Sequence, residues 1–133
     1  MPIYVDTSAW IALHEPRDTN HGAAKDRLQA LVAAQEILVA GLHTIVELAD
    51  GLARHYGQRE ASAELERLLS SPRLRVESSE PHLQAAREIF RGRTNWEVDL
   101  SDCLSFAFMK AKGIQRAFTY DRDFLKAGFQ VEA

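Results

Sequence analysis

The stretch Ile3-Tyr4-Val5-Asp6-Thr7-Ser8 begins as a short apolar run and stops at a carboxylate that is followed by two hydroxyl residues. The run is β-branched and aromatic, which predicts a buried strand. Asp6 then lies at the carboxyl end of that strand, the end at which open α/β sheets bind ligands. Thr7 or Ser8 can cap a following helix over residues 8–13. The turn therefore predicts a ligand-binding role for Asp6, with a purely capping role as the alternative.

Apolar segments of strand and helix type alternate along the rest of the chain. Strands are predicted at 37–40, 73–77, 116–120 and 128–131, and helices from a cap at 18 or 20 to residue 34 and over 44–56, 58–70, 79–92 and 101–112. A helical turn is expected at 122–124 and an irregular segment at 93–99. Because no hairpin signals separate the strands, we expect a mainly parallel sheet with helices on both faces. The strands at 73–77 and 128–131 should lie near its edges.

The composition predicts a single domain over residues 1–133 in the cytoplasm. A chain of 133 residues buries enough surface to need no disulfide, and its single cysteine, Cys103, cannot form an internal one. The sequence shows no signal peptide and no run near the ~20 apolar residues of a membrane span. With a net charge of −3, it lacks the basic surface of a simple nucleic-acid binder.

Four acids follow the predicted strands or begin the helices behind them. Asp6 and Asp121 come directly after strands. Glu47 and Asp102 lie in first helical turns near the same edge of the sheet. Local roles compete, because Glu47 can close a capping box with Thr44 and Asp102 can complement a helix dipole. Since the carboxyl ends of parallel strands share one edge, however, the four side chains can meet although they are distant in sequence.

A divalent cation would relieve the repulsion within such a cluster. Carboxylates about 4 Å apart repel by ~4 kcal/mol per pair at an effective dielectric constant of roughly 20. Their oxygens favour Mg²⁺ or Mn²⁺, which can activate water for attack on a phosphodiester. The pattern therefore predicts a nuclease site. Arg54, Arg93 and Arg122 are candidate contacts to RNA, with ordinary surface charge as the alternative for each.

The acidic motifs resemble those of a known family. The motifs that match, in order, are Asp6-Thr7-Ser8 after an apolar run, Glu47 in Thr-Ile-Val-Glu-Leu, Asp102 in Leu-Ser-Asp-Cys-Leu and Asp121 in Thr-Tyr-Asp-Arg-Asp-Phe. They look like the successive acidic motifs of PIN-domain ribonucleases and, more narrowly, of VapC-type toxins of toxin–antitoxin pairs. The resemblance covers nearly the whole chain, and its motifs are weak singly but strong together.

This resemblance implies a three-layer α/β/α sandwich with about five mainly parallel strands, and Mg²⁺- or Mn²⁺-dependent cleavage of RNA. It also implies a homodimer, and inhibition by a small antitoxin protein bound across the active-site groove. Metal binding is carried onto Asp6, Asp102 and Asp121, and onto Glu47 with a contact that can run through water. The additional candidates are Asp99 and Asp123 as extra acids, and Thr7 and Thr119 as residues that would position a water.

Two other functions are compatible with the sequence. A phosphotransfer or phosphatase domain would use Asp6 as a nucleophile, but such sites commonly need a second acid two residues further on, where this chain has Ser8. A non-catalytic binding module would keep the acids for folding or for docking a basic partner. The helix at 101–112 has little polar face, so we expect it to be buried between layers or covered by a second subunit.

Overall fold

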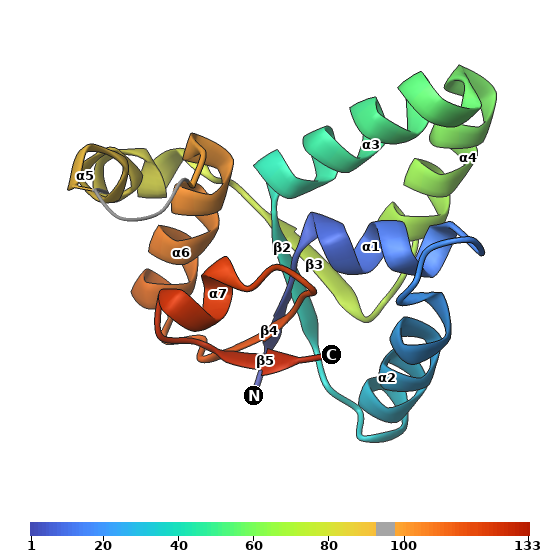
Figure 1. Ribbon diagram of the computed structural model, residues 1–133, viewed down its shortest axis with the longest axis horizontal. Coiled ribbons are helices and arrows are strands. Elements are labelled where there is room, and N and C mark those ends of the chain that lie inside the picture. The colour runs from blue at the N-terminus through green and yellow to red at the C-terminus, as the bar shows by residue number, and fades with distance from the viewer. Residues whose placement is uncertain (93–97) are drawn as a thin grey trace.

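The computed structural model describes residues 1–92 and 98–133, in which a five-stranded sheet lies between two layers of helices (Figure 1). The strands are β1 (Ile3–Val5), β2 (Leu38–Gly41), β3 (Leu74–Glu77), β4 (Arg116–Phe118) and β5 (Gln130–Glu132). The helices are α1 (Thr7–His14), α2 (His21–Ala33), α3 (Leu42–Tyr56), α4 (Gln58–Leu69), α5 (Leu83–Gly92), α6 (Leu100–Lys112) and α7 (Asp123–Lys126), with a 3₁₀ turn at Glu80–His82 before α5. The predicted α/β/α class is confirmed.

The sheet is parallel throughout and has the strand order β3-β2-β1-β4-β5. β3 and β5 lie at its two edges, as the sequence predicted. The chain builds outward from β1 through β2 to β3, and then returns to place β4 on the other side of β1. The strand order therefore reverses between β1 and β4, and this is the position at which such sheets open a crevice for ligands.

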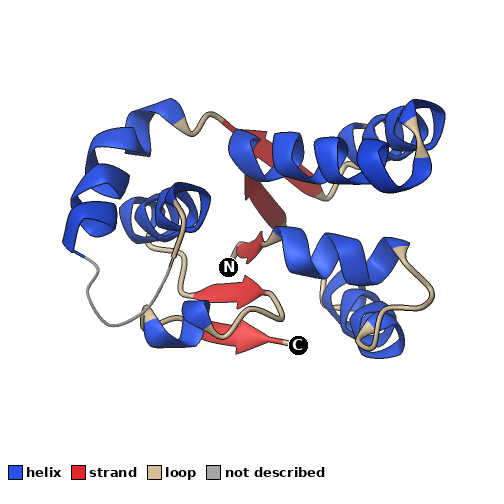
Figure 2. Ribbon diagram, turned by 45° about the horizontal axis from the view of Figure 1, so that its top comes forward, coloured by secondary structure: helices blue, strands red, loops and turns tan. Residues whose placement is uncertain are grey.

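Helices lie on both faces of the sheet (Figure 2), and an apolar core fills the space on each face. Ile3 and Val5 point into the core that is shared with α1 to α4. Tyr4 points to the opposite face and into the core shared with α5, α6 and α7. The split follows from the strand period of two, which sends successive side chains to opposite faces. Within the second core, α6 is buried along most of its length, as its apolar composition predicted.

The starts of α1 and α3 differ from the prediction. The residue that caps α1 is Asp6, which was the alternative role given to it, rather than Thr7 or Ser8, and its carboxylate accepts a hydrogen bond from the Ser8 N–H. α3 begins two residues before Thr44, after Gly41, and has no side-chain cap. The expected capping box is therefore wrong, because the backbone turns into the helix directly after β2. Glu47 consequently lies beyond the first turn of α3.

Part of the sequence interpretation lies outside the described residues. The structure does not describe residues 93–97. The candidate RNA contact Arg93 lies in this range, as does most of the irregular segment expected at 93–99. Among the helices of residues 1–92 and 98–133, none combines the length and the apolar character needed to cross a bilayer.

Candidate active site

The site begins where β1 and β4 end side by side. Val5 is paired with Phe118 in the parallel ladder, so the next residues along each strand, Asp6 and Thr119, are neighbours. The Asp6 N–H continues the ladder by donating to the Phe118 carbonyl at 3.1 Å. Sheet register thus brings together two segments that are more than a hundred residues apart in the chain.

The buried carboxylate of Asp6 is held by two hydroxyl groups. Its Oδ2 accepts from Ser8 Oγ at 2.8 Å and from Thr119 Oγ1 at 2.9 Å. Burial raises the pKa of Asp6 above its usual range, although the hydrogen bonds from Ser8 and Thr119 act in the opposite direction. The side chain is therefore fixed in position but poorly compensated in charge.

The same hydroxyl groups shape the loop after β4. Thr119 Oγ1 accepts from the Asp121 N–H at 3.0 Å, and Ser8 Oγ accepts from the Tyr120 N–H at 2.9 Å. Asp121 in turn accepts from the Asp123 N–H at 2.9 Å. These bonds turn the loop back toward β1 and orient Asp121 and Asp123 toward the same side of the sheet edge.

Asp102, Asp121 and Asp123 form the tightest acidic group in the described part of the chain, and we call them the acidic trio. One carboxylate oxygen from each lies within 4.8 Å of the others. Three partly buried carboxylates at this spacing match the hard oxygen ligands that Mg²⁺ and Mn²⁺ prefer, so the residues present fit a divalent cation.

The electrostatics of Asp102 show how strongly these acids interact. Burial, followed by the negative charges of Asp99, Asp121 and Asp6, raises the pKa of Asp102 to about 8. Asp99 is the cap of α6, and its Oδ1 accepts from the Asp102 N–H at 2.8 Å. Burial and the nearby charge of Asp121 also raise the pKa of Asp123. A cation placed among these groups would remove most of this repulsion.

With this geometry in place, comparison with known proteins identifies the family. A model of the PIN domain matches residues 3–130. The chain belongs to the PIN-domain family. This confirms the assignment to PIN-domain ribonucleases that the four acidic motifs suggested.

Relatives of this PIN domain include VapC20 of Mycobacterium tuberculosis, named as a 23S rRNA-specific endonuclease. It is 38% identical over 128 residues, which cover 96% of this chain and 95% of the relative. The crystal structure of VapC20, described as a sarcin-ricin loop cleaving toxin, superposes with a TM-score of 0.83 at 35% identity, covering 96% of this chain and 95% of that one. VapBC2 of Rickettsia felis, solved with a promoter DNA fragment, has a TM-score of 0.75 at 14% identity and covers 99% of this chain and 98% of that one, which shows the fold alone.

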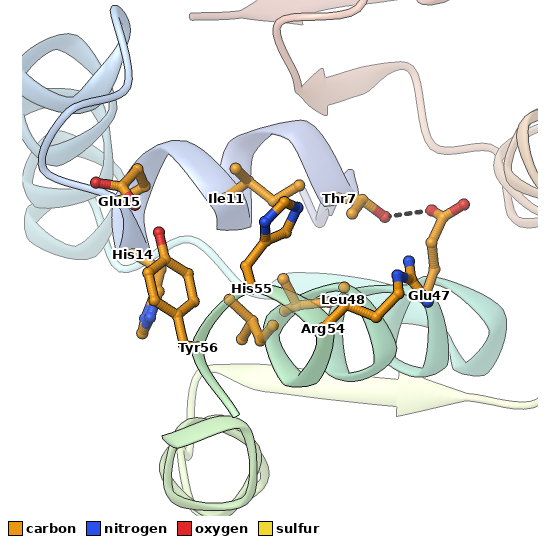
Figure 3. Close-up of a pocket in the computed structure, with 11 residues that line it drawn as sticks. Thr7, Ile11, His14, Glu15, Glu47, Leu48, Arg54, His55 and Tyr56 are labelled. Atoms are coloured by element: carbon orange, nitrogen blue, oxygen red, sulfur yellow. Dashed lines mark hydrogen bonds between the residues drawn. The ribbon is translucent and has the colours of Figure 1, made fainter. Parts of the chain in front are cut away.

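Glu47 of the PIN domain is not a member of the acidic trio. It is exposed on α3, and its Oε1 accepts from Thr7 Oγ1 at 2.6 Å (Figure 3). The pair stands at one end of a groove of about 460 Å³ between α1 and α3. Apolar side chains of Ile11 and Leu48 line this groove. The Arg54 side chain extends toward Glu47, the His55 ring lies beside Ile11, and the end away from Glu47 carries His14, Glu15 and Tyr56 (Figure 3).

The structure thus divides the predicted site residues of the PIN domain into groups. Asp102 and Asp121 converge with Asp123, which the sequence analysis named only as an additional candidate. Thr119 links Asp6 to the loop of Asp121, because its hydroxyl donates to Asp6 and accepts from the Asp121 N–H. The negative charge of Asp6 also raises the pKa of Asp102. Asp99 caps α6, and Glu47 accepts a hydrogen bond from Thr7.

The role of Ser8 was missed by sequence reasoning. Its hydroxyl joins Asp6 to the Tyr120 backbone, whereas the sequence suggested only a helix cap. A serine two residues after a capping aspartate is a common partner in local side-chain hydrogen bonds, and this was the available signal. The contact to the distant Tyr120 had no counterpart in the sequence pattern.

Proposed function

We propose that this chain is a Mg²⁺- or Mn²⁺-dependent endoribonuclease and the toxin of a toxin–antitoxin pair. The observation that carries the proposal is the convergence of Asp102, Asp121 and Asp123, whose carboxylate oxygens lie within 4.8 Å of one another beside Asp6. Such a group is repulsive by itself and suited to a hard dication. Membership of the PIN-domain family supports the same chemistry.

Each residue has a distinct proposed role. Asp6, Asp102 and Asp121 hold the cation, and Asp123 adds a carboxylate on the same side. When bound, the cation supplies a Lewis acid that activates water and stabilises charge on a phosphodiester. Ser8 and Thr119 keep Asp6 oriented by donating to its Oδ2. Glu47, held by Thr7, faces the groove and acts on the site through water.

RNA is the proposed substrate, and ribosomal RNA is the first class to test. The support is the 38% identity to a relative named as a 23S rRNA-specific endonuclease. Since the chain carries a net charge of −3, the cation must provide much of the attraction for phosphate. Arg54 in the groove and Arg122 at the start of α7 are exposed and add local positive charge.

The groove between α1 and α3 is the proposed binding place of the antitoxin. Its walls combine apolar contacts at Ile11, Leu48 and Leu52 with the charged ends of Glu47 and Arg54 (Figure 3). An amphipathic segment of a small protein would bury an apolar face here, and a basic side chain on it could reach the carboxylates. A segment bound in this groove would also block the approach to the acids from the side of α1.

A homodimer is proposed through the ends of α3 and α6 that lie near the site. Leu42, Val46 and Leu100 line an apolar hollow here and remain 50%, 51% and 37% exposed. Leu104 continues the hollow along α6. We expect sedimentation equilibrium to show a dimer that Val46→Glu dissociates, and a monomer at all concentrations would contradict this assembly.

The cytoplasm is the proposed location, in agreement with a chain that has a single cysteine.

The deciding experiment is cleavage of 23S rRNA and of a single-stranded RNA by the purified chain. We expect cutting with Mg²⁺ or Mn²⁺, loss of activity with chelator, and recovery when the ion is restored. Asp102→Asn should remain folded and inactive. Metal-dependent binding of RNA without cleavage would instead support a non-catalytic binding module, and cleavage that persists in chelator would contradict the metal site.

A further inference from the structure

Buried hydroxyl groups lie just below the predicted site acids on the same elements. The pairs are Tyr4 on β1 with Asp6 directly after it, Thr44 and Glu47 on α3, and Ser105 and Asp102 on α6. Members of each pair are two residues apart along the strand or three apart along a helix, spacings that return to the same face. The hydroxyls therefore form a second layer beneath the carboxylates.

These three hydroxyl groups bond to one another, and we call them the hydroxyl node. Tyr4 Oη lies 2.9 Å from Thr44 Oγ1 and 2.8 Å from Ser105 Oγ. Tyr4 Oη also accepts from the Gly41 N–H at 3.4 Å. Tyr4, Thr44 and Ser105 are 0%, 1% and 2% exposed. One buried phenol thus ties together the three elements that carry Asp6, Glu47 and Asp102.

His43 braces the node from the side. Its Nε2 lies 2.8 Å from Ser105 Oγ, and its Nδ1 lies 2.6 Å from Ser79 Oγ. A neutral imidazole has one donor and one acceptor, which suits two hydroxyl partners. Burial lowers the pKa of His43 to about 4, so the ring is neutral near pH 7. The brace extends the node to the segment between β3 and α5.

The hydrogen bonds of the hydroxyl node determine how β1, α3 and α6 are arranged more than they determine the free energy of unfolding. Replacing a buried hydrogen-bonded pair by apolar groups of the same shape is often nearly neutral for folding. A fully satisfied buried network, in contrast, selects one arrangement of the elements that it joins. The node joins β1, α3 and α6, which lead to or carry Asp6, Glu47 and Asp102, whereas Asp121 and Asp123 come from the loop after β4 and from α7.

We propose that the hydroxyl node sets the position of Asp102 on α6 relative to Asp6 after β1, two of the proposed cation ligands, and thereby the selectivity of the site between Mg²⁺ and larger divalent ions. Tyr4, Thr44 and Ser105 are positioning residues in this scheme. The inference rests on the proposed function. Mg²⁺ requires near-ideal octahedral geometry. Mn²⁺ is larger, and as a high-spin d⁵ ion it has no ligand-field preference for one geometry, so it tolerates displaced ligands better. A loosened node therefore weakens Mg²⁺ binding more than Mn²⁺ binding.

The test compares variants that remove or keep one hydroxyl. Thr44→Val deletes the hydroxyl at similar shape, Thr44→Ser keeps it, and Tyr4→Phe removes the central phenol. Mn²⁺ binding to the RNA-free chain is measured by electron paramagnetic resonance, and Mg²⁺ binding by competition with Mn²⁺. We expect Thr44→Val and Tyr4→Phe to weaken Mg²⁺ binding about tenfold, with a change of about threefold or less for Mn²⁺. Thr44→Ser should stay within about twofold of the wild type for both ions.

A matched control separates positioning from stability. Ile114→Val removes a buried methyl group beyond the far end of α6 and should lower stability without changing either ion affinity. If Thr44→Val does not fold, Tyr4→Phe carries the test. An unchanged Mg²⁺-to-Mn²⁺ affinity ratio in folded Tyr4→Phe would overturn the node while leaving the proposed function intact. A wild-type chain that binds neither ion would overturn both.

Discussion

Asp6 serves two purposes within a single side chain. Its carboxylate caps α1 and also accepts hydrogen bonds from Ser8 and Thr119 across the end of the sheet. A capping carboxylate at a helix start is normally stabilising, yet burial raises the pKa of this one and so disfavours its charged form. The same carboxylate therefore serves the helix cap and the candidate site, in surroundings that disfavour its ionised form.

Replacing Asp6 by asparagine should separate these two purposes. Asp6→Asn keeps the shape and one oxygen acceptor but removes the charge. We expect RNA cleavage to fall by more than about 100-fold, beyond the effect typical of residues outside a ligand set. Thermal unfolding should occur at the same or a higher temperature. Asp50→Asn, at an exposed acid on α3, is the control and should change neither quantity. Wild-type cleavage by Asp6→Asn would refute the assigned role.

Asp102 predicts a pH dependence of stability with a definite sign. Its pKa is raised from 3.8 to about 8, so the folded chain holds more protons than the unfolded chain between these values. Without a cation, the free energy of unfolding should fall as the pH rises through this window, by at most ~1.4 kcal/mol per pH unit. Unfolding in chelator from pH 5 to 8 measures the slope. Asp102→Asn should flatten it, and added Mg²⁺ should stabilise the chain most at the higher pH.

At the level of elements, the junction between β2 and α3 controls the hydroxyl node. Gly41 ends β2 and lies directly before α3, so the helix starts earlier than the Thr44 motif suggested. This early start frees Thr44 to bond to Tyr4 and places Glu47 beside Thr7. The end of β2 and the start of α3 thus determine the hydrogen-bond partners of Thr44 and Glu47.

Gly41 should be intolerant of any side chain. A Cβ at this position would lie 2.6 and 2.7 Å from ring atoms of His43 and 3.1 Å from Ser79 Oγ. We expect Gly41→Ala to lower the free energy of unfolding by about 1–3 kcal/mol and to weaken cleavage, because the His43 brace must move. Gly22→Ala in α2 is the matched control. Nothing lies within 4 Å of its Cβ, so stability should rise by up to ~1 kcal/mol. Denaturant unfolding distinguishes the two, and equal stability changes would contradict the account.

On the scale of the whole molecule, the active site owes its position to the reversal of strand order. β4 returns beside β1, so Asp121 and Asp6 meet, and α6 delivers Asp102 from the layer that covers the Tyr4 face. The groove toward α1 and α3 leads away from this point and carries Arg54. In the proposed function, an acidic chain would bind RNA through a bound cation and a few local arginines.

This arrangement predicts a modest contribution from Arg54 to RNA binding. Arg54→Ala should raise the KM for RNA severalfold and reduce the slope of log affinity against log salt by ~0.7, the value for one contact to a single strand. Arg67→Ala removes an exposed arginine of α4 that is paired with Glu64, and should leave the slope unchanged. Cleavage of a short RNA over a salt series provides the measurement. Equal slopes for both variants would exclude Arg54 as a phosphate contact.

The sequence by itself determined the class of fold, the order of elements and the family. Apolar periodicity and the acidic motifs are local signals, because backbone preference and face alternation depend on residues a few positions apart. These signals placed Asp6 directly after β1 and identified β3 and β5 as edges. They extended β4 too far, because it ends at Phe118 and Asp121 lies in the loop three residues later.

Only the tertiary structure decided which oxygen atoms meet. It grouped Asp123 with Asp102 and Asp121, turned Glu47 toward Thr7, and joined Tyr4 to Ser105 across 101 residues of chain. Spacing along the chain defines the face on which a side chain lies, but distances between elements follow from sheet register and from the packing of helices on the sheet. The choice of ligands within the acidic cluster is therefore a property of the folded molecule.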